Sequence, residues 1–164
     1  REGFGEHLFK DWRYDNNDSL NKDFALNQPE FSGNILVAGN NFGSGSSREH
    51  AAWALYDYGF KVIISSFYAD IFKENALNNG LLPVQVTAEY LEYLLLKIRE
   101  NPETRIIVNL KKQTVEIENS HLQEKFDIDP YKKTCLLNGY DDIDFLLTKL
   151  PNIKTFETNK LRFA

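Results

Sequence analysis

The sequence is very poor in cysteine, since Cys135 is the only one among 164 residues. A single thiol cannot form a disulfide within the chain. It also cannot supply the several thiolates that an iron–sulfur cluster or a thiolate metal site needs. This cysteine content fits a reducing, cytoplasmic setting. The chain shows no signal-peptide pattern, although it opens at Arg1 without a methionine.

Long apolar runs and clusters of positive charge are missing as well. No apolar run approaches the roughly 20 residues that a membrane-spanning helix needs. The formal net charge is −5, and the lysines and arginines are dispersed along the chain. Because a nucleic-acid backbone is bound through a basic patch, this distribution disfavours nucleic acid as a partner. The 42% of hydrophobic residues is ordinary for a soluble domain with a real core.

The middle of the chain alternates between segments typical of strands and segments typical of helices. Apolar runs at 35–38, 62–66 and 81–86 predict strands, the first of them buried. Between them, residues 47–58 and 69–79 predict helices, because Gly59 and Gly80 stand at helix-ending positions. Strand, helix, strand, helix, strand predicts an α/β fold with a βαβαβ core and an at least partly parallel sheet.

The flanking regions give weaker patterns. We expect a short helix over 6–13, a helix from Thr87 to about Asn101, a hairpin over 105–110 and 114–118, a weak strand over 126–128, and helices over 130–137 and 143–150. No internal repeat or linker separates these segments. The sequence therefore predicts one α/β domain over 1–164.

The most informative stretch is the glycine turn from Gly39 to His50, which joins the first predicted strand to the first predicted helix. It brings two serines and Arg48 to the start of that helix. A helix start presents unpaired N–H groups and a partial positive charge, and so it favours anions. The turn therefore predicts a site for a carboxylate or a phosphate.

Three common glycine-rich motifs do not fit this turn. A Walker-type loop ends in Gly-Lys-Ser/Thr, and no lysine lies between Gly39 and His50. The dinucleotide fingerprint G-x-G-x-x-G has Arg48 where its third glycine belongs. The hydrolase elbow G-x-S-x-G also fails at each serine of the turn. Nucleotide binding and ester hydrolysis lose their main support.

A purely structural reading of the same turn has to be weighed. Ser46-Ser47-Arg48-Glu49 matches a capping box, in which a serine and the glutamate satisfy helix N–H groups. A cap does not require the two glycines or the doubled serine, however. An arginine in the first helical turn also opposes the helix dipole by about 0.3–1 kcal/mol, a penalty that a bound anion would offset. The wider pattern favours a functional site.

The segment Gly43–Ala52 resembles the swivelling domain of the aconitase family. The similarity continues through residues 62–72 and 78–83. Residues 3–9 and Cys135–Gly139 resemble, within that family, the small subunits of isopropylmalate dehydratases. The resemblance implies a swivelling β/β/α fold. Members of this family carry a further segment before the position of Arg1, with a loop that helps to choose the substrate, and we expect that segment to be absent from this chain.

The resemblance also implies a function and roles for individual residues. Isopropylmalate dehydratases isomerise 2-isopropylmalate to 3-isopropylmalate by dehydration and rehydration, in leucine biosynthesis. By position, Ser46 matches the catalytic base, acting as an alkoxide. Ser47 and Arg48 match positions that bind the substrate carboxylate, and Gly43 and Gly45 would let the backbone approach the substrate. The family's [4Fe-4S] cluster lies in a large subunit, so we expect a heterodimer and no metal in this chain.

Other polar residues favour structural roles. We expect a structural hydrogen bond for His50, surface or packing positions for His7 and His121, and packing for Trp12-Arg13-Tyr14, with stacking of the arginine. We expect Asp141, Asp142 and Asp144 to cap the helix over 143–150.

Three alternative functions remain open at this stage. One is the small subunit of a sister hydro-lyase acting on homoaconitate, citraconate or methyl-substituted malates. Another is a non-catalytic anion-binding module. RNA binding is disfavoured by the acidic charge.

Overall fold

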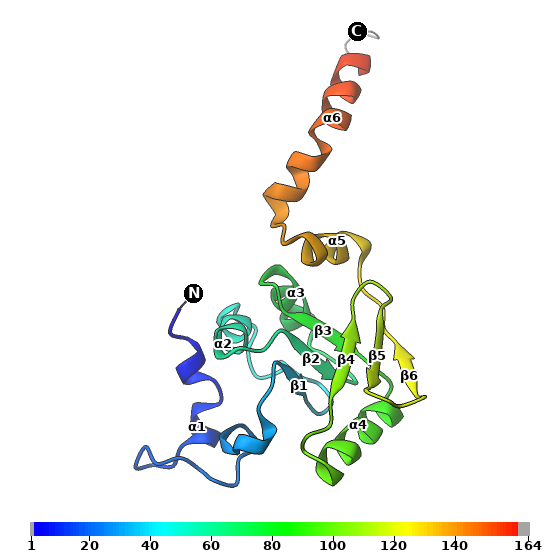
Figure 1. The fold of residues 1–164 in the computed structure, drawn as a ribbon. Helices are drawn as coiled ribbons and strands as arrows, with labels where there is room; N and C mark the ends of the chain where they lie inside the picture. Colours follow the sequence, from blue (N-terminus) through cyan, green and yellow to red (C-terminus); the bar gives the residue numbers. More distant parts are fainter. Residues whose placement is uncertain (1, 161–164) are drawn as a thin grey trace. The chain divides into compact units, whose positions relative to one another are not determined.

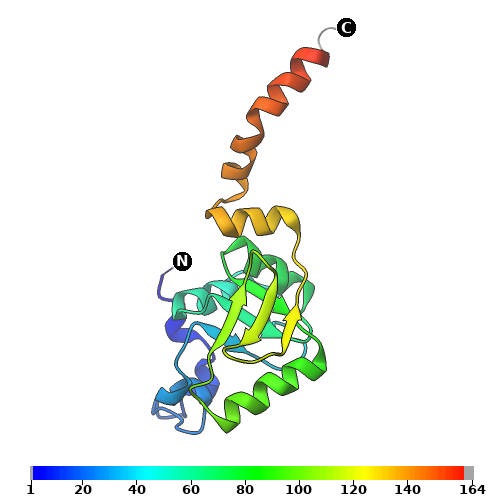
Figure 2. The same cartoon turned by 45° about the vertical axis from the view of Figure 1, so that its right-hand side comes forward.

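The computed structural model describes residues 2–160 and is shown in two views (Figures 1 and 2). One compact unit ends at Ile128, and a second begins at Asp129. The expectation of one domain over 1–164 stays a prediction, and its ends, Arg1 and residues 161–164, lie outside the described residues.

Three parallel strands form the centre of the first unit, as the alternating pattern predicts. They are β1 (Ile35–Val37), β2 (Val62–Ser65) and β3 (Leu82–Gln85), in the order β1-β2-β3. Ile63 and Ile64 of the central strand are both fully buried, because helices and a second sheet leave neither face to solvent. The edge strand β1 is only half-buried, in contrast to the buried strand expected there.

The helices α2 (His50–Tyr58) and α3 (Asp70–Asn78) connect these strands. Leu55 of α2 and Phe72 of α3 join Ile63 in one buried cluster, so both helices contribute to the same core. Gly59 ends α2 with φ of 118°, a conformation that glycine adopts without strain. The βαβαβ core is therefore confirmed.

A second sheet and one long helix complete the first unit. The helix α4 (Ala88–Glu100) is followed by the antiparallel strands β4 (Ile106–Asn109), β5 (Thr114–Ile117) and β6 (Gln123–Lys125). Thr87 caps α4 as predicted, accepting a hydrogen bond from the Tyr90 N–H at 3.2 Å. The Tyr90 hydroxyl donates to the carbonyl of Val115 at 3.0 Å and ties α4 to β5.

Two predicted elements of the first unit are wrong in detail. The third strand of the second sheet lies at 123–125 rather than 126–128, because Phe126 turns into the core and its N–H bonds to the Gln113 carbonyl outside the ladder. The predicted helix over 6–13 is split into η1 (Gly5–His7) and α1 (Lys10–Arg13). Phe9 between them has φ of 48°, a left-handed conformation that interrupts a helix.

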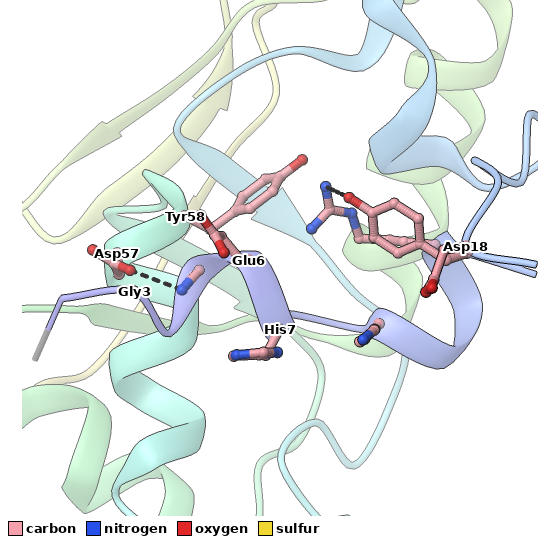
Figure 3. A pocket seen from close by; sticks show the side chains of 10 residues that line it. Gly3, Glu6, His7, Asp18, Asp57 and Tyr58 are labelled. Atoms are coloured by element: carbon pink, nitrogen blue, oxygen red, sulfur yellow. Dashed lines mark hydrogen bonds between the residues drawn. The ribbon is translucent and has the colours of Figure 1, made fainter.

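The N-terminal segment is attached to α2 at Gly5. Its N–H donates to the Asp57 carboxylate at 2.8 Å, an interaction drawn in Figure 3. A Cβ at Gly5 would lie 2.8 Å from the backbone nitrogen of Tyr58, so only glycine permits this approach. Two short 3₁₀ turns, η2 (Ala25–Asn27) and η3 (Pro29–Phe31), lead from there to β1.

The second unit consists of α5 (Pro130–Asn138) and α6 (Asp142–Lys160). The aspartate cap is confirmed for Asp141 and Asp144, whose side chains each accept the other's backbone N–H. Asp142 does not take part, because its carboxylate accepts from the Tyr131 hydroxyl and the Lys132 ammonium group instead. The helix expected over 143–150 is wrong in length, because it continues through Pro151. The leucines and lysine just before Pro151 are good helix formers, and they carry the helix into the proline, whose missing N–H removes one helical hydrogen bond. None of the described helices, α6 included, combines the length and apolarity of a membrane crossing.

Tyr68 gives a stability prediction for the core. Its buried hydroxyl lies 2.6 Å from the Ile63 carbonyl and 3.1 Å from that of Val84, and both can accept its one proton. We expect Tyr68→Phe to lower the free energy of unfolding by about 1–3 kcal/mol near neutral pH, as measured by urea denaturation. Tyr56→Phe is the control, because that ring is 42% exposed.

The same loss should depend on pH. Burial raises the pKa of Tyr68 far above its ordinary value of 10.0, so the folded chain keeps this proton where the unfolded chain loses it. The contribution of the Tyr68 hydroxyl to the free energy of unfolding is therefore full below about pH 10 and decreases above it. Above pH 10, the difference in the free energy of unfolding between wild type and Tyr68→Phe should become smaller. A difference that stays constant would contradict the role of the buried Tyr68 hydroxyl.

Candidate functional site

The glycine turn forms a loop from Gly39 to Glu49, here called the site loop, between β1 and α2. It leaves the carboxyl end of a strand in a parallel sheet. In open α/β sheets, ligands bind in the crevice beyond these strand ends. The topology therefore places the predicted residues at a favourable position for a ligand.

The start of the site loop is fixed by the backbone. The Phe42 N–H donates to the Phe67 carbonyl, and the Ala69 N–H donates to the Phe42 carbonyl, each at 3.0 Å. Gly43 then adopts φ of 84°, and a Cβ there would overlap the ring of Phe72. Gly43 is therefore required for the packing of the loop on α3.

Ser46 is half-buried in the middle of the site loop. Its Oγ accepts a hydrogen bond from the Arg48 N–H at 3.2 Å. This contact is a local turn that fixes the direction of the Ser46 hydroxyl.

Arg48 and Ser47 are exposed beside Ser46, and Gly45 lies in open space. Within residues 2–160, no carboxylate lies at ion-pair distance from the Arg48 guanidinium. Its charge is therefore available to an anionic ligand.

The capping-box interpretation is wrong. The helix begins at His50, its N-cap residue is Glu49, and no side chain makes a capping hydrogen bond there. Arg48 consequently lies before α2 rather than in its first turn, and the expected conflict with the helix dipole is smaller. The serines are free of the capping role that the pattern suggested.

The end of the site loop is held by a side chain that sequence reasoning gave no role. The Asn79 amide, 9% exposed, donates to the Glu49 carboxylate and to the Asn75 carbonyl, both at 2.8 Å. Its oxygen accepts the indole N–H of Trp53 at 2.9 Å. Asn79 falls within residues 78–83, which carry part of the family resemblance, but no periodicity or spacing in the sequence indicates its partners.

A cavity of about 910 Å³ opens beside the site loop. Ser46, Arg48, Gly43 and Gly45 line it, whereas Ser47 is not among the lining residues. The remaining wall is mostly apolar and includes Leu8, Phe9, Trp12, Phe24, Leu26, Leu36, Phe42 and Phe72. A cationic and hydroxyl-bearing rim on an apolar cavity suits a small acid with a hydrocarbon group.

The other candidate residues have structural positions. His50 contacts the rings of Phe4 and Trp53, with centroids 5.2 and 4.7 Å away, and no hydrogen bond joins its side chain to another residue of 2–160, in contrast to the expectation. His7 and His121 are exposed. The expected stacking of Arg13 is confirmed, since its guanidinium lies 4.9 Å from the centre of the Tyr58 ring.

A second hollow, of about 810 Å³, is lined by groups of both charges (Figure 3). They include the acids Glu6, Asp18 and Asp57 and the cations Lys10 and Arg13. Asp57 already accepts the Gly5 N–H, so this hollow shows no convergent donor set for one ligand. Among the described residues, no group of three or more His, Cys, Asp or Glu is placed to hold a metal ion.

Comparison with known proteins gives consistent matches. Residues 1–89 match the family described as the aconitase C-terminal domain. The chain is 60% identical over 160 residues to a 3-isopropylmalate dehydratase small subunit from Christiangramia forsetii, covering 98% of this chain and 78% of that protein. It is 52% identical to the protein of the same name from Cytophaga hutchinsonii, covering 96% and 78%.

A solved structure supports the fold. The 3-isopropylmalate dehydratase of Methanocaldococcus jannaschii matches with a TM-score of 0.57 at 27% identity, covering 82% of this chain and 74% of that chain. The aconitase-type α/β fold expected from the residue pattern is confirmed by this similarity and by the family match.

Gly43 gives a stability prediction for the site loop. Gly43→Ala introduces both a strained φ and an overlap with Phe72, and we expect it to lower the free energy of unfolding by about 2 kcal/mol or more. Gly45→Ala is the matched control, since nothing lies within 4 Å of its Cβ position, and it should change stability by less than about 0.5 kcal/mol. Equal urea midpoints for the two variants would refute the packing role.

Proposed function

Because this chain belongs to the family of 3-isopropylmalate dehydratase small subunits, a branch of the aconitase family, we propose that it forms half of a hydro-lyase active site. With a large subunit, the enzyme would convert 2-isopropylmalate to 3-isopropylmalate by removing and returning water, in leucine biosynthesis. The similarity to named small subunits over nearly the whole chain is the observation that carries this function. The site residues rest on the geometry of the loop.

Ser46 is the proposed base. The reaction removes a proton from a weakly acidic carbon beside a carboxylate, and this requires a strong base held close to it. A serine becomes one only where its anion is stabilised. The Arg48 N–H at 3.2 Å, the positive end of α2 and the Arg48 guanidinium are the stabilising groups that this chain offers.

Arg48 and Ser47 are the proposed ligands of the substrate carboxylate. The guanidinium can bind a carboxylate through two parallel hydrogen bonds, which fixes both its position and its orientation. The exposed Ser47 hydroxyl can donate a further bond. Gly43 and Gly45 keep side chains away from the rim of the cavity, so the substrate can approach the loop backbone.

The apolar wall of the same cavity supports a branched hydrocarbon substrate. An isopropyl group placed against Phe42 or Leu36 would be removed from water, at a gain of about 25 cal/mol per Å². Citraconate and the methyl-substituted malates offer less apolar area. The cavity thus favours isopropylmalate over these smaller acids.

The family's [4Fe-4S] cluster does not fit the residues of this chain. Cys135 is the one cysteine of the sequence, and among the described residues no three or more His, Cys, Asp or Glu side chains are grouped to hold a metal ion. We therefore place the cluster in the large subunit, and the substrate between the two chains. A cytoplasmic location and the absence of nucleic-acid or membrane partners remain part of this proposal.

Reconstitution tests the shared site. We expect neither subunit alone to interconvert the two isopropylmalates, whereas mixing this chain with its iron–sulfur-loaded large subunit should restore turnover, followed by the absorbance of the dehydrated intermediate. Turnover by this chain alone would overturn the shared site. Turnover of homoaconitate or citraconate, with none of isopropylmalate, would reassign the chain to a sister hydro-lyase.

Ser46→Ala tests the base within the reconstituted enzyme. Loss of a general base lowers kcat by about 10²–10⁴-fold, and we expect at least this effect with little change in KM. Ser44→Ala is the matched control, because Ser44 is an exposed serine of the same loop to which we assign no catalytic role. If Ser46→Ala turns over as fast as Ser44→Ala, the base lies elsewhere.

A further inference from the structure

The helix α3 and its flanking residues hold the site loop at both ends. Before α3, Phe67 and Ala69 exchange backbone hydrogen bonds with Phe42. After α3, Asn79 binds Glu49, the last residue of the loop. The stretch between these two attachments on the loop contains Ser46 and Arg48. One short helix therefore sets the span that the loop has to bridge.

The two attachments differ in kind. The first uses only backbone hydrogen bonds, between Phe42 and residues 67 and 69, so it depends on no particular side-chain donor or acceptor. The second depends on one amide, since the Asn79 side chain provides both the N–H that binds Glu49 and the oxygen that binds Trp53. No other residue type offers two donors and an acceptor of this size and shape.

The Asn79 interactions take place in a buried setting, which increases their strength. Asn79 is buried and its side chain makes three hydrogen bonds, one of them to a charged carboxylate. Hydrogen bonds to charged groups are stronger than those between neutral groups, and a buried group left without its partner is costly. The Glu49 carboxylate is thus fixed one residue from Arg48 and three from Ser46.

We propose that Asn79 is a positioning residue for the isomerase reaction, which acts through Glu49 on the geometry of Ser46 and Arg48. This inference rests on the proposed function. We call the hydrogen bond from the Asn79 amide to the Glu49 carboxylate the clamp. Without it, the site loop would remain attached at Phe42, but the end of the loop near Glu49 would be more mobile. Displacement of a catalytic group by about 1 Å can cost on the order of 10²-fold in rate.

The test uses Asn79→Ala in the reconstituted enzyme, with Asn75→Ala as the matched control. Asn75 lies one turn earlier on α3, and only its backbone carbonyl accepts from the Asn79 amide. We expect Asn79→Ala to lower kcat roughly 10–100-fold with a small change in KM, and Asn75→Ala to stay within about twofold of wild type. Assays well below the unfolding temperature separate this effect from instability.

Two further variants separate positioning from a general loss of structure. Glu49→Gln keeps an oxygen that accepts the Asn79 N–H, so it should retain most activity, whereas Glu49→Ala should match Asn79→Ala. The double variant should then be no worse than either single one, because both remove the same contact. Hydrogen exchange of residues 44–48 should quicken in Asn79→Ala but not in Asn75→Ala.

The outcomes distinguish the clamp from the function on which it rests. If Asn79→Ala turns over within twofold of wild type while Ser46→Ala is inactive, the clamp is refuted and the proposed function stands. If Asn79→Ala and Glu49→Ala reduce kcat independently and their effects multiply, the two residues do not act through one contact, and the clamp is equally refuted. If Ser46→Ala is fully active, the site itself is wrong.

Discussion

The hydrogen bonds of Phe42 with Phe67 and Ala69 are the constraint on which the rest of the site depends. They extend the parallel pairing of β1 and β2 beyond the last residue of the sheet, through a bridge between Phe42 and Tyr68. This extension decides where the chain turns at Gly43, and hence where Ser46 and Arg48 lie. Without it, a loop of small and flexible residues would have no defined conformation in which to hold a ligand.

The site combines rigid attachments with a small free stretch. Phe72 packs beneath Gly43 and Asn79 binds Glu49, while Ser44 and Gly45 between them are exposed. Catalytic groups need supporting contacts that hold them within a fraction of an ångström, yet a substrate also has to enter. Concentrating the supports at the two ends of the loop satisfies both requirements.

The sequence predicted those parts of the fold in which the local pattern and the final packing agree. The apolar run of β2 and Gly59 after α2 gave the βαβαβ core, and the glycine turn identified the residues of the proposed site. Prediction failed at Phe9, whose left-handed conformation breaks the expected N-terminal helix. It also failed at Pro151, through which α6 continues although none of its residues is buried, so packing does not account for the longer helix.

The clamp at Asn79 shows a different limit of sequence reasoning. Asparagine beside glycine at the end of a helix is a common turn pattern, and nothing in it indicates a partner 30 residues away. Such a contact exists only after α2 and α3 have packed together, so composition and periodicity carry no trace of it. The capping box failed for the related reason that Glu49 is bound by Asn79.

Cys135 is buried, and the sequence contains no methionine. Oxidants attack proteins chiefly at exposed thiolates and thioethers, so this chain presents almost no sulfur to them. If the proposed assembly with an iron–sulfur subunit holds, that subunit would be the one that oxidants damage. This chain could then be recovered intact and paired with a fresh copy of its partner.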